Sequence, residues 1–244
     1  MADSLKHVEK IIDTLVSKLT PLSFGPPVQC VYNPLVYARS AHLTYWRQYG
    51  RSPKEVLFLG MNPGPWGMVQ TGVPFGDVVM VSEWLKISEP VNVPDKVHPK
   101  RLVQGFDCPR IEVSGRRFWG WASQRFKTPQ RFFERFWVAN YCPLAFMEAG
   151  GRNRTPDKIP RQEIEPVLKA CDQALVQTIR LLGPHIVVGV GRFAAQQARR
   201  ALADIPIPVG QITHPSPANP RANAGWSELI EQELLAMGIR IEDD

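Results

Sequence analysis

Three segments of the sequence place a polar side chain directly after an apolar run, where it could take part in chemistry. Asn62 lies in FLGMNPGPWG, Asn140 lies in VANYCPL, and His214 follows PVGQIT. Amide side chains donate and accept hydrogen bonds without titrating near neutral pH, and an imidazole can donate, accept or carry charge. If one edge of the fold collects all three, they form a pocket with two amides and an imidazole.

Each of these residues alone also has a structural explanation. An asparagine after a strand is most often a turn former that hydrogen-bonds its own backbone. A single histidine is usually structural, and four others are expected to be so: His7, His42, His98 and His185. Only their shared position at strand ends, together with their motifs, favours a functional interpretation of Asn62, Asn140 and His214.

The elements that would carry these residues alternate between strands and helices. Short β-type runs span residues 55–60, 136–142, 185–191 and 208–213. Helical periodicity spans residues 3–19, 35–48, 78–87, 160–182, 191–203 and 221–237. Apolar strands that alternate with helices are typical of a parallel sheet covered on both faces. We therefore predict an α/β fold with three layers, α/β/α, around a central, mainly parallel four-stranded sheet whose carboxyl edge holds the pocket.

The chain is expected to form a single domain over residues 1–244, because no linker-like stretch divides it. Residues 1–20 are predicted to form an N-terminal helix and residues 239–244 a flexible tail. The 23 prolines gather in loops at 61–76, 90–109, 143–160 and 206–220. Proline restricts φ and so lowers the entropy lost when a loop becomes ordered. These loops are therefore expected to hold a fixed geometry.

Composition and charge limit the kinds of partner. Hydrophobic residues make up 44% and charged residues 21%, as in globular proteins. The excess of 29 Lys and Arg over 23 Asp and Glu, a net charge of +6, biases the surface modestly toward anionic partners. The apolar runs are far shorter than the ~20 residues of a membrane span, and the first helix is unlike a signal peptide. We expect a cytoplasmic protein without membrane binding, nucleoid-associated in a bacterium or nuclear in a eukaryote.

The four cysteines are isolated from one another. Cys30, Cys108, Cys142 and Cys171 include no CxxC pair and no histidine at ligand spacing. We expect reduced, mostly buried thiols, no metal and no cofactor. A metal or iron–sulfur site assembled from all four through the fold is the alternative.

Four motifs resemble one known family. The whole of residues 60–77, the NYCPL segment, the GVGRF turn at 189–193, and HPSP followed by NP, AN and GW resemble the single-strand-selective monofunctional uracil-DNA glycosylases. The order and spacing match from about residue 30 to 238. The resemblance implies a monomeric repair enzyme that hydrolyses the N-glycosidic bond of deoxyuridine in single- and double-stranded DNA. It implies no cofactor and no obligate protein partner.

The resemblance also assigns the two catalytic roles. Asn62 stands where the family positions a water, which an amide can orient but hardly deprotonate. His214, neutral and donating to the uracil O2, would stabilise the negative charge that develops on the leaving base. No lysine stands in these motifs as an amine nucleophile, in keeping with a glycosylase that leaves the abasic strand uncut.

Further positions would recognise the base. Asn140 matches the residue that pairs with the N3–H and O4 of uracil, and Phe75 matches the ring that stacks on the flipped base. Gly64 matches a position without a side chain near the pyrimidine C5, where Met61 and Met68 could line the pocket. This implies that 5-substituted uracils such as 5-hydroxymethyluracil are accepted.

The segment 214–226 matches the loop that enters DNA when a base is flipped. Its expected DNA contacts are Pro215, Ser216, Pro217, Ala218, Asn219 and Arg221. Animal members carry arginine where this chain has Ala218, a departure that bears on duplex DNA more than on a single strand. Arg221, three residues further on, is the candidate substitute for that arginine. Single basic residues are usually only solvated, but four could contact phosphates: Arg116, Arg117, Arg152 and Arg154.

Two alternatives stay open at this point. One is a catalytically silent nucleic-acid binding module that keeps the pocket. The other is a nucleotide-binding enzyme that uses GVGRFA at 189–194, a GxGxxA in the setting of a dinucleotide fingerprint. The acidic residue about 20 positions further on is missing, since Asp204 comes too early, and a tight strand-to-helix turn is favoured.

Overall fold

The computed structural model of the protein describes residues 2–51 and 53–241. At its centre four parallel strands form a sheet in the order β3–β2–β6–β7. These strands are β2 (Val56–Gly60), β3 (Phe136–Asn140), β6 (Ile186–Val190) and β7 (Val209–Ile212). Every residue of β2 is buried, as expected for a central strand covered on both faces.

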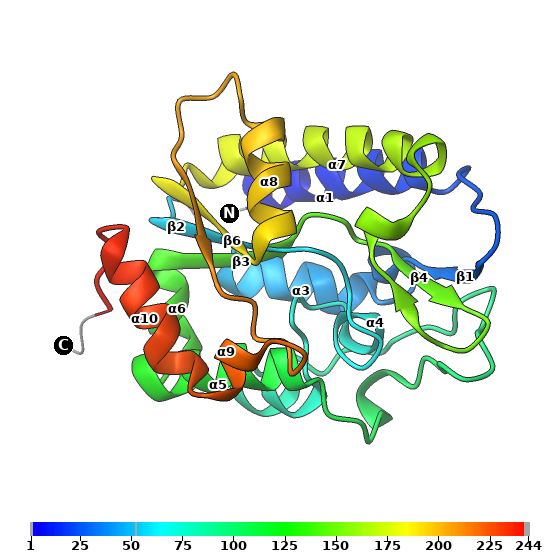
Figure 1. The fold of residues 1–244 in the computed structure, drawn as a ribbon, viewed down its shortest axis with the longest axis horizontal. Coiled ribbons are helices and arrows are strands. Elements are labelled where there is room, and N and C mark those ends of the chain that lie inside the picture. Colours follow the sequence, from blue (N-terminus) through cyan, green and yellow to red (C-terminus); the bar gives the residue numbers. More distant parts are fainter. Residues whose placement is uncertain (1, 52, 242–244) are drawn as a thin grey trace.

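Helices cover both faces of this sheet (Figure 1). On one face lie α1 (Ala2–Leu19), α7 (Arg161–Leu182) and α8 (Arg192–Ala201). On the other face lie α3 (Arg39–Tyr49), α5 (Val113–Phe126), α6 (Pro129–Arg135) and α10 (Trp226–Ala236). The predicted three-layer α/β/α fold is confirmed. Because the register pairs Gly60 with Asn140 and Val190 with Ile212, the carboxyl ends of the strands meet at one edge.

The helix α7 shows why its periodicity could be recognised in the sequence. Its buried residues recur every three or four positions from Ile164 to Leu182, so one stripe faces the core. The helix ends where Gly183 takes the left-handed conformation, with φ of 55°.

The structure divides or shortens three predicted helices, those at 35–48, 78–87 and 221–237. In their place are α2 (Pro34–Tyr37) with α3, a π-helical turn (Met80–Trp84), and α9 (Pro220–Asn223) with α10.

Several elements escaped prediction. A small antiparallel sheet has the order β1–β4–β5, built from β1 (Val28–Tyr32), β4 (Ala145–Glu148) and β5 (Asn153–Arg154). The helices α5 and α6 were also missed, as were α4 (Met68–Thr71) and the 3-10 turns Gly105–Asp107 and Pro156–Lys158. Strands this short carry little periodicity, and α5 contains Gly115, Gly120 and aromatic residues that are weak helix formers.

The ends of the described chain are packed. The helix α1 occupies the region expected for the N-terminal helix. Ile239 is buried, and the Arg240 carbonyl accepts a hydrogen bond from the Arg135 guanidinium at 2.9 Å. The chain is therefore held at least to this point, and residues 242–244 of the expected tail lie outside the described residues.

All four cysteines are buried and none forms a disulfide. Within residues 2–51 and 53–241, no helix is long and apolar enough to cross a membrane. In the same described part of the chain, no three His, Cys, Asp or Glu side chains are grouped as metal ligands.

Candidate active site

The carboxyl edge of the sheet brings three of the predicted site residues together. A Cβ at Gly60, the last residue of β2, would clash with both the Asn140 amide oxygen and the Phe75 ring. The Phe75 and His214 rings lie 6.2 Å apart between centroids, at an angle of 42°. Asn140, Phe75 and His214 therefore converge beyond the end of β2, and only glycine at position 60 leaves room for them.

Asn62 follows the same strand after Met61. Its Nδ2 donates to the Leu144 carbonyl at 3.1 Å, so its Oδ1 is the atom left free for a ligand. Met61 is half-buried, and its carbonyl accepts a hydrogen bond from the Cys142 N–H at 2.9 Å. The backbone and the side chain of this region are thus both tied to the loop that follows β3.

Side-chain amides hold the rest of the proline-rich loop. Asn153 Nδ2 donates to the Pro63 carbonyl at 3.0 Å, and Gln70 Nε2 donates to the Pro65 carbonyl at 2.9 Å. Proline restricts φ at these positions, and each amide then fixes the carbonyl of the same residue. The rigidity expected of this loop is therefore present, and it depends on Gln70 within the loop and on Asn153 from outside it.

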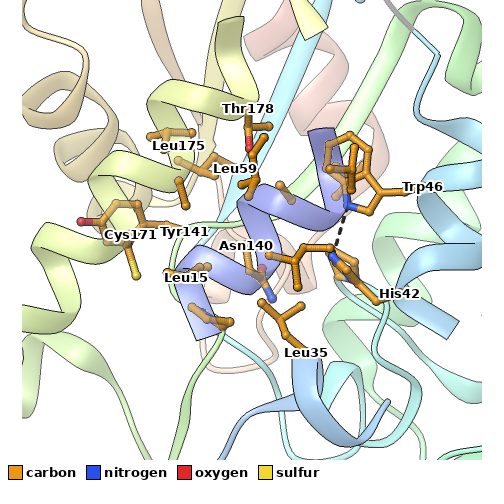
Figure 2. A pocket seen from close by; sticks show the side chains of 18 of the residues that line it. Leu15, Leu35, His42, Trp46, Leu59, Asn140, Tyr141, Cys171, Leu175 and Thr178 are labelled. Carbon is orange, nitrogen blue, oxygen red and sulfur yellow. Dashed lines mark hydrogen bonds between the residues drawn. The ribbon is translucent and has the colours of Figure 1, made fainter. Parts of the chain in front are cut away.

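Asn140 lies between the site and the interior. Its Nδ2 contacts the Met68 sulfur at 3.2 Å, and Met68 is buried at the start of α4. An apolar pocket between α1, α3, α7 and the sheet lies behind it, with Asn140, Leu15 and Leu175 in its lining (Figure 2). Hydrogen bonds made by Asn140 are strengthened by such weakly polar surroundings.

Most of the predicted site residues do not line this apolar pocket. Met68 and Asn140 line it, whereas Asn62, Phe75 and His214 do not. Of the three polar side chains at the strand ends, only Asn140 is in contact with this pocket.

Phe75 is held in a strained backbone conformation. Its φ is 53°, a left-handed value that is rare for residues other than glycine, and such strain is found where the surroundings impose it. The ring stacks on Phe118 of α5, with centroids 5.0 Å apart and planes 14° from parallel. Trp119 of the same helix donates its indole N–H to the Pro74 carbonyl at 3.2 Å. A Cβ at Gly115 would clash with the Phe75 carbonyl, so α5 packs directly on this segment.

His214 is held in one tautomer. Its Nδ1 accepts a hydrogen bond from the Ser216 backbone N–H at 3.1 Å, so in the neutral ring the proton is on Nε2. Burial lowers the pKa of His214 from 6.5 to about 4 because the charged ring would lose its hydration. The ring is therefore neutral at physiological pH and presents an N–H donor.

The residues around His214 fix its backbone. Asn219 Nδ2 donates to the His214 carbonyl at 3.4 Å, and Trp226 Nε1 donates to the Thr213 carbonyl at 2.8 Å. Thr213 is held in addition by two hydrogen bonds to the Glu233 carboxylate, at 2.6 and 2.7 Å. The backbone that carries the imidazole is thus held by hydrogen bonds between β7 and α10.

The segment GVGRFA is a tight strand-to-helix turn, as favoured from the sequence. A Cβ at Gly189 would clash with the Ala195 backbone in α8. Gly191 has φ of 91°, and a Cβ there would lie 3.2 Å from the Cβ of His214. The glycines of this turn therefore serve close packing, and one of them makes room for the site histidine.

The predicted DNA-entering loop lies next to His214. Pro217 and Ala218 are exposed, while Pro215 is buried and accepts a hydrogen bond on its carbonyl from Arg117 at 3.1 Å. Ser216 Oγ accepts from the Ala218 N–H at 3.2 Å, which tightens the turn.

The end of this loop is capped. Asn219 caps α9 by accepting the Arg221 N–H at 3.2 Å. Arg221, expected as a substitute for the arginine missing at position 218, has its guanidinium 3.3 Å from the Glu233 carboxylate on α10. Both groups are partly exposed, so this pair is weak and a phosphate could compete for the arginine.

Gly64 has a neighbour that the sequence did not indicate. A Cβ at Gly64 would clash with the Glu112 carboxylate, and a Cβ at Gly67 would lie 2.8 Å from Glu112 Cγ. Burial raises the pKa of Glu112, and hydrogen bonds from the Ser114 and Trp66 backbone N–H groups oppose this. The space that a side chain at Gly64 would take is therefore held by the protein itself.

Four further residues support the site without any local sequence signal. They are Glu112, Phe118, Asn153 and Glu233. Their contacts join residues tens of positions apart, and Phe118 belongs to a helix that was not predicted. Of the four arginines proposed to contact phosphates, Arg116 pairs with buried Asp77 at 2.9 Å and Arg154 with Glu148 at 2.9 Å.

The fold and the strand-edge site agree with one superfamily. The family model of the uracil DNA glycosylase superfamily matches residues 47–233. The solved structure of wild-type SMUG2 from Pedobacter heparinus superimposes with a TM-score of 0.61 at 15% sequence identity, covering 93% of this chain and 97% of that one. This second likeness supports the fold alone.

Two curated relatives narrow the assignment. Single-strand selective monofunctional uracil DNA glycosylase of Mus musculus is 48% identical over 227 residues, 92% of this chain and 81% of its own length. The protein of the same description from Bos taurus is 47% identical over 227 residues, 92% and 84% of the two chains. The chain belongs to the single-strand selective monofunctional uracil-DNA glycosylase family.

Proposed function

We propose that this protein removes uracil from DNA by hydrolysing the bond between the base and the deoxyribose, leaving the strand uncut. The observation that carries the proposal is the state of His214, a neutral imidazole whose Nδ1 is engaged by Ser216 and whose Nε2–H is available beside Phe75. Departure of uracil places negative charge on its ring, and a fixed donor in a partly buried site stabilises that charge.

The attacking water would be held by Asn62. Because its Nδ2 is engaged by the Leu144 carbonyl, its Oδ1 is left to accept a hydrogen bond from water. The amide has no titratable proton acceptor near neutral pH, so it orients the water and does not deprotonate it fully. The bond to the base must therefore be largely broken before the water attacks. His214 promotes this bond cleavage.

Recognition of the base falls to Asn140 and Phe75. Asn140 offers an acceptor to N3–H and a donor to O4 of uracil, whereas cytosine presents the opposite groups at these positions. The Phe75 ring, already stacked on Phe118, would cover one face of the extruded base. Acceptance of 5-hydroxymethyluracil and related bases is part of the proposal, with Met61 and Met68 at the edge of the base. Gly64 allows the close approach of Glu112, so the space expected there for a 5-substituent is occupied by that carboxylate.

The substrate is DNA with the uracil turned out of the stack. The segment Pro215–Arg221 would enter the space that the base leaves, with the exposed Pro217 and Ala218 at its tip. The protein is proposed to act as a monomer on single- and double-stranded DNA, without a cofactor.

A labelled single-stranded oligonucleotide with one uracil tests this proposal. The protein is incubated with it in the presence of EDTA, and strand scission is compared with and without hot alkali. Scission only after alkali is expected, since a monofunctional glycosylase leaves an intact strand with an abasic site. Scission without alkali would contradict the monofunctional assignment, and no product on single-strand, duplex or hydroxymethyluracil substrates would favour a silent binding module.

Two variants test the assigned roles. Asn62→Ala and His214→Ala are each expected to lower the single-turnover rate about 100-fold or more, the usual effect of removing an oriented donor or a water ligand. Both should still bind the oligonucleotide, since neither side chain is required for contact with the phosphates. Full activity in both variants would exclude these roles.

A further inference from the structure

Two arginines without acidic partners face one tryptophan beside the candidate site. The Arg101 Cζ lies 5.0 Å and the Arg110 Cζ 5.7 Å from the centroid of the Trp66 ring. These residues come from separate segments of the chain, and Trp66 belongs to the loop that carries Asn62. Contacts of this type hold a guanidinium by its flat face.

The charges of these arginines are not neutralised within the protein. Among the described residues, no carboxylate forms an ion pair with Arg101 or Arg110. Arg101 uses one terminal nitrogen to donate to the Lys100 carbonyl at 2.8 Å, and its buried Nε has no partner. In contrast, Arg116, Arg154 and Arg221 each pair with an acid. Positive charge is therefore left over at Trp66, whereas an acid compensates it at Arg116, Arg154 and Arg221.

The position of the cluster is fixed relative to the active-site loop. Gln70 joins the two segments, because its Nε2 donates to both the Pro65 and the Leu102 carbonyls at 2.9 Å. Glu112, two residues after Arg110, packs on Gly64 and Gly67. The segments that carry Arg101 and Arg110 are thus each in contact with the loop.

The cluster lies within reach of DNA bound at the site. Trp66 lies four positions after Asn62, which is at most about 14 Å of extended chain. At about 3.4 Å per nucleotide along one strand, this corresponds to no more than about four nucleotides. The exposed side chains of Leu102 and Ile111, next to the two arginines in sequence, add apolar surface of the kind that unpaired bases cover.

We propose that Trp66, Arg101 and Arg110 form a docking site for the phosphates of an unpaired DNA strand that flanks the uracil. The indole holds the guanidinium planes, and their remaining N–H groups bind phosphate oxygens, for which arginine is well suited. This inference deepens the proposed function and depends on it for the position of the reacting nucleotide.

Binding of uracil-free single-stranded DNA tests this site separately from catalysis. The Kd is measured for the intact protein, Arg101→Gln and Arg110→Gln over a range of salt concentrations. Each lost phosphate contact on a single strand should lower the slope of log K against log[salt] by about 0.7 and raise the Kd. Trp66→Leu, which removes the support of both arginines, should raise the Kd while keeping the charge.

A matched control removes the same charge elsewhere. Arg161→Gln on α7 loses an exposed arginine that pairs with Glu165, and it should leave the Kd and the salt slope unchanged. Thermal unfolding of each variant shows whether it is folded. An unchanged slope in both Arg101→Gln and Arg110→Gln would overturn the proposal, and an equal loss of affinity for duplex DNA would overturn the assignment to an unpaired strand. Because these oligonucleotides contain no uracil, this binding result does not depend on the outcome of the excision test.

Discussion

Asn62 and His214 each use one polar atom to hold the side chain in place and leave the other for the substrate. Asn62 donates to the Leu144 carbonyl and presents an acceptor, and His214 accepts from Ser216 and presents a donor. A hydrogen-bond acceptor can orient the attacking water, and a hydrogen-bond donor can stabilise the negative charge on the departing uracil. The residue types agree with these roles, but the orientation follows from the contacts alone.

The pH dependence of excision follows from the state of His214. With a pKa of about 4, the ring stays neutral as pH falls from 8 to about 5.5 and takes up a proton only near pH 4. That proton would go to Nδ1 and oppose the Ser216 N–H, so the ring could no longer keep its orientation. We expect the single-turnover rate to be flat down to about pH 5.5 and to fall below pH 5.

The measurement is a pH series of single-turnover rates on the single-stranded uracil substrate. Circular dichroism at each pH separates protonation of the site from unfolding. A rate that is already half-lost near pH 6.5, the unperturbed value for histidine, would show that burial does not lower this pKa.

Among the elements, α5 contacts the site through three of its residues. It supplies Phe118 beneath Phe75, donates from Trp119 to the Pro74 carbonyl, and approaches the Phe75 backbone at Gly115. This helix is rich in residues of low helix propensity, and its stability comes from burying aromatic side chains against the sheet. Periodicity in the sequence therefore did not indicate it, although the position of Phe75 depends on it.

A pair of glycines in α5 allows a controlled test. Propensity alone predicts that Gly→Ala in a helix stabilises by about 0.5–1 kcal/mol. Gly120→Ala should do so, since nothing lies within 4 Å of the added Cβ. Gly115→Ala should instead lower the Tm and the excision rate, because its Cβ would clash with the Phe75 carbonyl. Thermal unfolding and single-turnover rates of both variants provide the check, and similar behaviour of the two would contradict the proposed support of Phe75.

At the scale of the whole molecule, a buried histidine joins α3 to the loop that leads to Phe75. His42 Nδ1 lies 2.8 Å from the Gly72 carbonyl, and Trp46 Nε1 donates to His42 Nε2 at 3.2 Å, a contact visible in Figure 2. Both ring nitrogens are engaged, which agrees with the structural role expected of this histidine. Burial lowers the pKa of His42 to about 4.

This histidine predicts a dependence of stability on pH. The unfolded chain binds a proton at His42 below about pH 6.5, while the native protein does so only near pH 4, so stability falls as pH decreases through this window. At pH 5 the loss is about 2 kcal/mol relative to pH 7. Denaturant unfolding at both pH values should show at least this loss in the intact protein, because His214 has a similarly lowered pKa and adds to it. The loss should be about 2 kcal/mol smaller in His42→Gln. An equal pH dependence in that variant would assign the effect to other groups.

The central sheet and the long helices could be predicted from the sequence, because a buried strand or one stripe of a helix repeats its apolar residues locally. The helix α7 and the strand β2 are examples. The four sequence motifs and their order along the chain were enough to indicate the family and the residues Asn62, Asn140 and His214. The small sheet and α5 could not be predicted, since their residues gain stability from contacts with distant segments.

The sequence by itself determined the polar groups available at the strand ends and the glycines and prolines around them. Only the tertiary structure decided which atoms face the substrate. The Nδ2 of Asn62 is bound by a carbonyl 82 positions later, Glu112 fills the space beside Gly64, and Phe118 supports Phe75. The physical reason is that local periodicity reports which residues are buried, whereas hydrogen bonds and ring stacking between distant segments set the direction of each side chain.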